Sequence, residues 1–304
     1  MLILLVTSHI VLNKRTFYPF FFNLIFIKSS AGVFSYPCQC TNSSRMKKSL
    51  ITLTVTLLTL LLIFWIPPIP QAQEFHAFVD GRSLMGVVNA GNVLSNIPFL
   101  IIGVYGIIIV SRHSRSAAIS AIYGVLFIGV LLTGIGSAYY HTHPDNDRLV
   151  WDRIPMTIVF MAFLSATLAE LVSRPVGVRL LLPFVAVGIA SVLWWHHTET
   201  IGKGDLRLYF WVQFYPMLAV AMLLLLYYKP GVKTILPSLI WIVVWYTVAK
   251  IFEQLDAQIY RMIPVSGHTL KHLAAAASTG YFVRLYRVKY VTSAAVLCQE
   301  NRSS

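Results

Sequence analysis

Three histidines, one serine and one aspartate have spacings that suit metal-assisted hydrolysis. Ser137 lies four residues before His141, and His268 lies four residues before His272, so each pair would share one face of a helix. A histidine pair at this spacing can bind one metal ion, and a third imidazole from another helix would leave one coordination position open for water. Asp152 begins the apolar run that follows His141. Ionisable groups at the ends of apolar runs are costly and usually functional.

The reaction that these residues predict is hydrolysis at a zinc ion. Zinc lowers the pKa of a bound water to about 7 and polarises a carbonyl group. We interpret His141, His268 and His272 as candidate zinc ligands and Asp152 as the candidate general base. Ser137 could hydrogen-bond the metal-bound water or the developing oxyanion.

The same residues also permit a metal site without catalysis. In a non-enzymatic seven-helix lipid sensor or scaffold with a structural zinc, Asp152 or His143 would supply a fourth ligand and close the site. Without a metal, the histidines would be interfacial residues that bond water or backbone. A transporter would need broken helices or an inverted repeat, and the sequence shows neither.

The composition predicts that these residues belong to a membrane protein. Hydrophobic residues make up 57% of the 304 residues and charged residues only 12%, as in polytopic membrane proteins. The net charge of +13 lies mostly in short loops and the C-terminal tail, which favours contact with anionic lipid over nucleic-acid binding. Cys38, Cys40 and Cys298 lie outside the apolar runs. They are therefore not candidate metal ligands, and a Cys38–Cys40 disulfide stays an open alternative.

Seven apolar runs follow residue 91, each long enough to cross about 30 Å of hydrocarbon as a helix of ~20 residues. The expected fold is all-α, a seven-transmembrane-helix bundle preceded by an N-terminal signal-like or anchor helix. The seven runs are residues 92–111, 117–141, 151–172, 178–196, 208–228, 234–256 and 264–287.

The charges of the loops predict how this bundle is oriented. Basic residues follow the first, third, fifth and seventh runs, whereas the alternate loops are richer in acidic residues. By the positive-inside rule, the basic loops and the C-terminus are cytoplasmic. His141, Asp152, His268 and His272 would then all lie at the extracytoplasmic end, together with the N-terminus of the seven-helix part. Loop charge alone thus predicts that residues far apart in sequence lie at one depth.

The chain is expected to have five parts. Met46, Lys47 and Lys48 precede an apolar run that ends in prolines, which is typical of a signal peptide or an uncleaved anchor, with a weak cleavage site at Ala72. Met46 is thus a candidate start, and an extension before it would not be translated. The parts are a poorly structured extension (1–45), the signal-like or anchor helix (46–72), an extracytoplasmic segment (73–91), the seven-helix domain (92–288) and a cytoplasmic tail (289–304).

Other polar residues near the run ends have structural interpretations. Asn92, Ser95 and Asn96 fall within two turns and predict a hydrogen-bond network between helices. Lys250 and Glu253 are three residues apart, so they could pair with each other or belong to the site. The residues expected to face water or the membrane interface are His143 and the run 194–197.

Four motifs resemble those of the alkaline ceramidases. They are Asn92-Val93-Leu94-Ser95-Asn96, Gly136-Ser137-x-x-x-His141, Trp151-Asp152-Arg153-x-Pro155-Met156 and Gly267-His268-x-x-Lys271-His272. The resemblance covers roughly residues 75–288. The short loops look like the bacterial ceramidase-domain branch, in a superfamily that includes adiponectin-receptor-like proteins.

This resemblance implies a function and a set of site residues. It implies a seven-helix membrane amidase that holds Zn²⁺ with His141, His268 and His272, with Ser137 and Asp152 beside the ion. The implied reaction is hydrolysis of the amide of ceramide, or of a related N-acyl lipid, to a sphingoid base and a fatty acid. The implied partner is thus a membrane lipid and not a nucleic acid, while the head group and oligomeric state stay open.

This sequence has few of the acidic residues that form the calcium site in the family's eukaryotic enzymes. Those enzymes bind calcium with an acidic Trp-Cys-Glu-like segment and a further Glu before the first core helix. Here the corresponding stretch, residues 75–82, has Asp80 as its one acidic residue, and Asn89 stands near the place of the later Glu. Calcium sites use about six to eight oxygen ligands. Asp80, Asn89 and Asn92 would therefore form at most a weak Ca²⁺ site.

Overall fold

The computed structural model describes residues 39–114 and 116–292. The chain divides into two units, residues 1–45 and 46–304. Of the first unit, residues 39–45 are described, as the first turns of helix α2. The expectations for most of the N-terminal extension, for a Cys38–Cys40 disulfide, for Cys298 and for the end of the C-terminal tail lie outside the described residues.

The described residues form helices and connecting loops, apart from one isolated bridge between Leu84 and Val87. The all-α prediction is therefore confirmed. The elements are α2 (Gln39–Trp65), η1 (Gln73–His76), α3 (Ala90–Leu94), α4 (Ile97–Arg112), α5 (Ala117–Thr142), α6 (Asn146–Leu171), α7 (Arg174–Thr200), α8 (Arg207–Tyr227), η2 (Pro230–Val232), α9 (Leu236–Gln254), α10 (Asp256–Met262), α11 (Gly267–Tyr286) and the single π-helical segment η3 (Arg287–Thr292).

Seven helical segments of the described chain are long and apolar enough to cross a membrane. They are Ser43–Trp65 in α2, Ala90–Arg112 in α3 and α4, and the helices α5, α6, α7, α8 and α9. The last core run of the sequence forms α11, whose 20 residues extend about 30 Å. Histidine and lysine side chains near its start make α11 less apolar than the others. The set of spans indicates an integral membrane protein.

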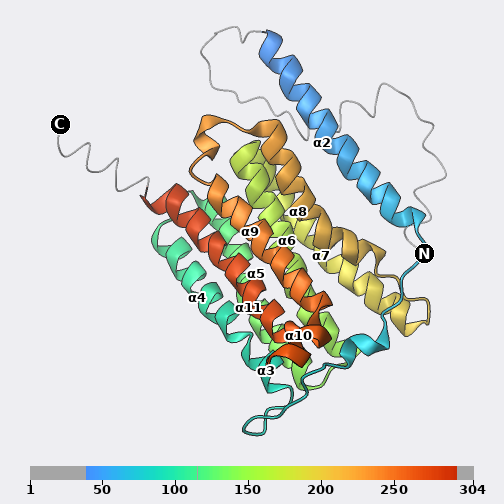
Figure 1. The fold of residues 1–304 in the computed structure, drawn as a ribbon. Helices are drawn as coiled ribbons and strands as arrows, with labels where there is room; N and C mark the ends of the chain where they lie inside the picture. The colour runs from blue at the N-terminus through green and yellow to red at the C-terminus, as the bar shows by residue number, and fades with distance from the viewer. Residues whose placement is uncertain (1–38, 115, 293–304) are drawn as a thin grey trace. The chain divides into compact units, whose positions relative to one another are not determined.

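Helix α6 forms the centre of the bundle. It packs on α5, α7 and α8, and 78% of its apolar stretch is buried. Helix α11 packs between α9 and α4, and α4 in turn packs on α5 (Figure 1). Helices α8 and α9 pack on α6 and α11 respectively, and among the described helices they make no extensive contact with each other.

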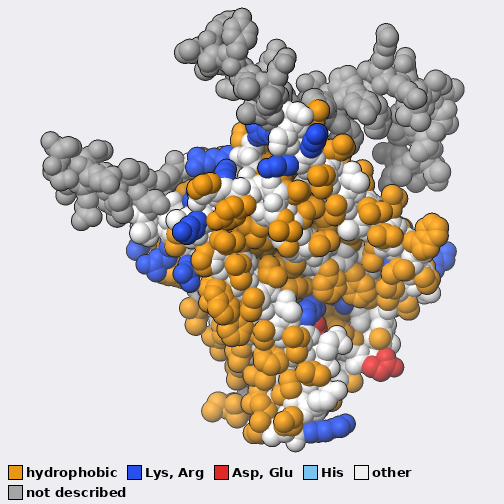
Figure 2. Space-filling model, turned by 45° about the horizontal axis from the view of Figure 1, so that its top comes forward, with side chains coloured by type: hydrophobic (Ala, Val, Ile, Leu, Met, Phe, Trp, Pro, Cys, Tyr) orange, Lys and Arg blue, Asp and Glu red, His pale blue; other side chains and the backbone are white. Residues whose placement is uncertain are grey.

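The alternating direction of the helices brings the candidate site residues to one end. The last turns of α5 and α9 meet α3 and the first turns of α6 and α11 there, at the lower end in Figure 1. The basic residues that follow α4, α6, α8 and α11 belong to the opposite end. Figure 2 shows a broad hydrophobic surface, with most of the visible Lys and Arg side chains toward one end. Which end faces the cytoplasm stays a prediction.

The segment after α2 is hydrogen-bonded to the core of the bundle. The Arg207 guanidinium donates to the Ile66 carbonyl oxygen (2.9 Å), and the Gln71 backbone N–H donates to the Glu199 carboxylate (3.0 Å). The Gln71 side-chain oxygen accepts a 2.6 Å hydrogen bond from the buried guanidinium of Arg153. Residues 66–71 therefore complete the polar interactions of the bundle interior.

We expect α2 to stay attached to the mature protein as an anchor. Cleavage after Ala72 would remove Gln71 and leave the buried Arg153 guanidinium without its side-chain hydrogen-bond partner, at a cost of about 1–3 kcal/mol or more. Intact-mass analysis of protein purified from membranes through a C-terminal tag should find residues before Ala72. A mature N-terminus at Gln73 would contradict this expectation.

Candidate metal centre

Three buried imidazoles converge at the end of the bundle where the candidate site residues lie. His141 is in the last turn of α5, and His268 and His272 are in the first two turns of α11. Their ring centroids are 4.8 to 4.9 Å apart in every pair. One ligand atom from each residue lies within 4.8 Å of the other two, so the group could hold a metal ion. The side-chain spacing in the sequence therefore singled out residues that do meet in space.

The distance between two of the ring nitrogens fits a tetrahedral ion. Nε2 of His141 and Nε2 of His272 are 3.3 Å apart. Two nitrogens bound to one tetrahedral zinc at 2.0–2.1 Å would be separated by about 3.4 Å. Nδ1 of His141 is buried and has no hydrogen-bond partner in the part of the chain that the structure describes. This nitrogen lies on the opposite side of the ring from Nε2 and cannot bind the same ion, so the observation that fits a metal is the separation of the two Nε2 atoms.

The start of α11 is held in place by its own cap and by α10. The Ser266 hydroxyl accepts a hydrogen bond from the Thr269 N–H (3.0 Å), and the Asp256 carboxylate accepts one from the His268 N–H (2.8 Å). A Cβ atom at Gly267 would lie 2.4 Å from a backbone oxygen near the end of α9. Only glycine permits this close approach. These contacts fix where α11 begins and thus where its histidines point.

The expected hydrogen-bond network between helices is present on the α3 side. The Ser95 hydroxyl and Nδ1 of His272 form a 2.8 Å hydrogen bond, which leaves Nε2 of His272 to face the other imidazoles. The Asn92 side-chain oxygen accepts a 2.9 Å hydrogen bond from Thr269. Asn96, in contrast, donates to the Asn92 backbone oxygen within its own chain segment. Bonds to the second ring nitrogen orient a ligating histidine, so Ser95 can set the orientation of His272.

Ser137 and Asp152 lie on facing helices beside this cluster. Ser137 is one turn before His141 on the buried face of α5, and Asp152 is buried in the first turns of α6. The Ser137 hydroxyl lies close to the Asp152 carboxylate. A Cβ atom at Gly136 would lie 2.0 Å from the Trp151 carbonyl oxygen. The glycine thus lets the two helices approach closely enough for this contact.

The other histidines of the site end do not join the cluster in the described part of the chain. His143 is exposed, as expected. Nε2 of His196 is bonded to the Asp147 carboxylate at 2.8 Å. Trp195, which the sequence placed in an interfacial belt, is instead fully buried, with the Arg153 guanidinium 4.2 Å from its ring centroid. That part of the belt prediction is wrong, because the ring packs inside the bundle against this guanidinium, a favourable cation–π contact.

The residues proposed for a weak calcium site make hydrogen bonds instead. Both carboxylate oxygens of Asp80 accept 2.7 Å hydrogen bonds from Arg82, and the guanidinium holds the pKa of that carboxyl below its usual range. The Asn89 amide donates to the His141 carbonyl oxygen (2.9 Å). Asn92 accepts from α11, as described above. A guanidinium therefore provides the positive charge beside Asp80.

The segment before α3 covers the cluster in a way that the sequence did not reveal. The Phe78 ring packs on His141 and on His268, with centroids 4.6 and 4.7 Å apart. Nδ1 of His76 is bonded to the Tyr140 hydroxyl (2.9 Å). These contacts join a loop to helices far away in sequence, so no spacing rule could have found them.

A half-buried group of charges also adjoins the histidines. Nζ of Lys271 is 2.9 Å from one carboxylate oxygen of Glu253, and Nζ of Lys250 is 2.6 Å from the other. Nζ of Lys271 is also 3.4 Å from Nε2 of His268. The Lys250–Glu253 pairing was visible in the sequence, whereas the participation of Lys271 depends on the register between α9 and α11. Lys250 and Glu253 therefore pair with each other, as one interpretation predicted, and through Lys271 they also adjoin His268, as the other predicted.

The family model described as ceramidase matches residues 86–283. The chain belongs to the ceramidase family. The match includes His141, His268 and His272, and also Ser137 and Asp152. Membership implies a hydrolase that acts on amide bonds. No curated protein and no solved structure matches the chain.

We expect replacement of a clustered histidine to abolish metal retention. His272→Ala removes one of three imidazoles, so the affinity for a divalent ion should fall by well over about tenfold. Inductively coupled plasma mass spectrometry of the purified protein measures the bound metal. His143→Ala is the matched control, because this exposed histidine lies outside the group. A His272→Ala protein with the metal content of the unaltered protein would refute the site.

We expect Gly136→Ala to destabilise the protein by about 1–3 kcal/mol, because the new methyl group must push α5 from α6. Gly124→Ala is the matched control on the same helix, since a Cβ there meets nothing within 4 Å. Thermal unfolding of both variants in one detergent measures the difference. Equal unfolding temperatures for the two variants would show that the close approach at Gly136 is unimportant.

Proposed function

We propose that this ceramidase-family protein is a zinc-dependent membrane amidase that hydrolyses ceramide or a related N-acyl lipid. One observation carries the proposal: three buried imidazoles converge within the residues that match the family. Nitrogen ligands in a tetrahedral arrangement favour zinc over magnesium or calcium, which prefer oxygen ligands. The 3.3 Å nitrogen separation between His141 and His272 supports the same choice.

The open character of the ligand group favours catalysis over a structural zinc. A closed site needs a fourth protein ligand, for which Asp152 or His143 were the candidates. Among the described residues, the ligand group consists of the three imidazoles, and His143 is exposed. A coordination position would then remain for water, which an amidase requires and a sensor does not.

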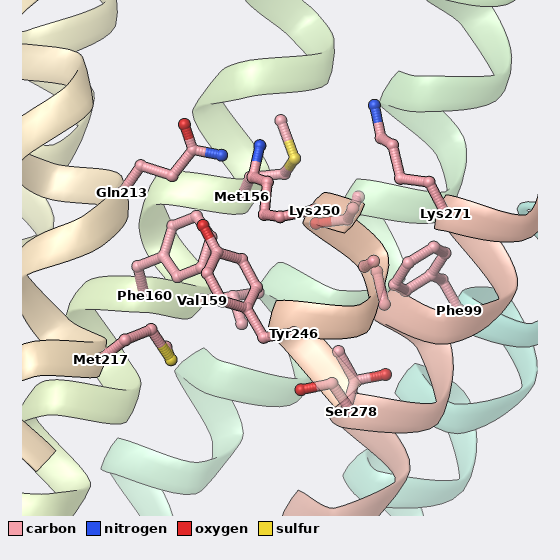
Figure 3. Close-up of a pocket in the computed structure, with 14 residues that line it drawn as sticks. Phe99, Met156, Val159, Phe160, Gln213, Met217, Tyr246, Lys250, Lys271 and Ser278 are labelled. Atoms are coloured by element: carbon pink, nitrogen blue, oxygen red, sulfur yellow. The ribbon is translucent and has the colours of Figure 1, made fainter. Parts of the chain in front are cut away.

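A cavity beside the histidines suits a lipid substrate. It has a volume of about 90 Å³ and is lined mainly by apolar side chains of α6, α8, α9 and α11, several of which are labelled in Figure 3. This space accepts only part of a long acyl chain. The remainder would extend into the membrane between α8 and α9, which pack on other helices and not extensively on each other.

The residues around the histidines would divide the work of hydrolysis. When bound, zinc supplies a Lewis acid that polarises the amide carbonyl and acidifies water. Asp152 accepts a proton from the attacking water at a carboxylate oxygen as the new C–O bond forms. Asp152 then returns this proton to the amine nitrogen as the C–N bond breaks. Ser137 donates a hydrogen bond that orients the Asp152 carboxylate, and Phe78 restricts access of bulk water from the loop side.

We also propose how the enzyme lies in the membrane. The catalytic domain is residues 92–288, residues 73–91 cover it, and the segment up to residue 72 acts as its anchor. The basic ends of α4, α6, α8 and α11 favour a cytoplasmic position for the opposite end of the bundle. The metal centre would then face the extracytoplasmic leaflet.

We expect purified protein to release a sphingoid base and a fatty acid from ceramide, or the corresponding amine from another N-acyl lipid. Asp152→Asn should lower kcat by about 10²-fold or more, because the general base is lost, while bound zinc stays at the level of the unaltered protein. Liquid chromatography with mass spectrometry of both products measures turnover.

A chelator should abolish this turnover, and added zinc should restore it. His143→Ala serves as the control with unchanged turnover, since His143 is exposed. Retained zinc without turnover of any N-acyl lipid in a panel would favour the non-enzymatic sensor. Full activity of Asp152→Asn would exclude Asp152 as the general base.

A further inference from the structure

The cavity beside the metal centre is lined by two ammonium groups that share one neighbouring carboxylate. Its lining includes the ammonium groups of Lys250 and Lys271 and no aspartate or glutamate. Glu253 lies behind this wall and contacts each lysine through a different oxygen, at 2.6 and 2.9 Å. One carboxylate therefore pairs with two ammonium groups and can neutralise only one of the two positive charges. The three side chains are half-buried. Partial burial of a charge without a full counter-charge is unfavourable, so a negatively charged ligand at this wall would be favourable.

Hydrogen-bond donors without partners point to the same wall. An ammonium group has three donors, and Lys250 uses one of them on Glu253. The Tyr246 hydroxyl is buried, lies near the Gln213 side chain, and makes no other side-chain hydrogen bond in the described chain; both residues line the cavity. In Figure 3 the polar ends of Gln213, Lys250 and Lys271 lie along one side of the cavity, and Met217 and Ser278 lie along the other. The cavity thus combines a donor-rich side with an apolar interior.

Charges from the neighbouring helix do not cancel this excess. On α6, Arg153 and Asp152 lie within electrostatic range of the group, and they carry opposite charges. Nη1 of Arg153 is itself buried and has no hydrogen-bond partner among residues 39–114 and 116–292. The charged groups near the cavity are therefore three cations and two carboxylates, before any metal ion is added.

We propose that Lys250 and Lys271, with the Tyr246 hydroxyl, form a binding site for the carboxylate of a long-chain acyl compound. The apolar side of the cavity would hold the adjoining methylene groups. Because Nζ of Lys271 is 3.4 Å from Nε2 of His268, a carboxylate bound there would lie next to the metal centre. A neutral lipid could use the donors as well, but it would leave the charge unbalanced.

Two sources could supply such a carboxylate. It could be the fatty acid released by the proposed amide hydrolysis, or an acidic substituent that lies close to the amide of the substrate, as in an N-acyl amino acid. The second source rests on the proposed function and would narrow its substrate class. Both require the same pair of ammonium groups.

The binding test needs no turnover. Displacement of a fluorescent fatty acid by palmitate, and separately by hexadecanol, is measured with the full protein in nanodiscs of neutral phosphatidylcholine. Palmitate should compete about tenfold better than hexadecanol, and Lys250→Met should remove this preference. Lys250→Arg keeps the charge and should retain it. Lys233→Met is the matched control, since this exposed lysine precedes α9 at the opposite end of the bundle.

The substrate arm uses two amides that differ in charge and little in size, N-palmitoylglycine and N-palmitoylethanolamine. A preference of about tenfold in kcat/KM for the glycine compound that Lys250→Met removes would assign the carboxylate to the substrate. Palmitate competition with no preference between the amides would assign it to the product. Equal competition by palmitate and hexadecanol together with equal kcat/KM values would overturn the proposed site, even if both amides are hydrolysed. Selective palmitate binding without amide hydrolysis would instead contradict the amidase.

Discussion

Burial of three imidazoles in an apolar bundle is the constraint on which the rest of the site depends. Each ring nitrogen needs a partner, because an unpaired polar atom in a low-dielectric interior is costly. Ser95 supplies one partner for His272, and the close approach of His141 and His272 supplies another. Nε2 of His268 lies 3.4 Å from Nζ of Lys271. Helices α3, α5 and α11 must therefore meet at one point, and the caps and glycines at this end serve that requirement.

The sequence allowed the helices and the main site residues to be predicted. The run 117–141 corresponds almost residue for residue to α5, since long apolar runs have few alternatives to a membrane-spanning helix. The start of α6 was placed five residues too late at 151, because hydropathy does not register the cap that the Asp145 carboxylate makes with the Arg148 N–H (2.7 Å). The end of the run 234–256 concealed a break at Leu255 and a separate helix, α10.

Interactions that depend on three-dimensional register could not be predicted. Lys271 lies within the motif that contains His268 and His272. Its contact with Glu253, however, depends on the register between α9 and α11. Phe78 reaches two imidazoles from a loop whose path no periodicity describes. Trp195 belongs to a run of aromatic residues and histidines that is typical of a membrane interface. Its burial against Arg153 became visible only in the structure. Local pattern therefore indicated the three histidines that cluster, while tertiary packing determined their surroundings.

Because α8 and α9 pack sparsely on each other, the surrounding bilayer would influence how the proposed enzyme takes up its substrate. If substrate enters at this seam, lipid chains must give way wherever the two helices separate. Ordered, tightly packed leaflets resist such separation more than fluid ones do. Substrate would then reach the proposed metal centre at different rates in two membranes that contain equal amounts of it. The physical state of the lipid would thus regulate the enzyme without binding to a specific site.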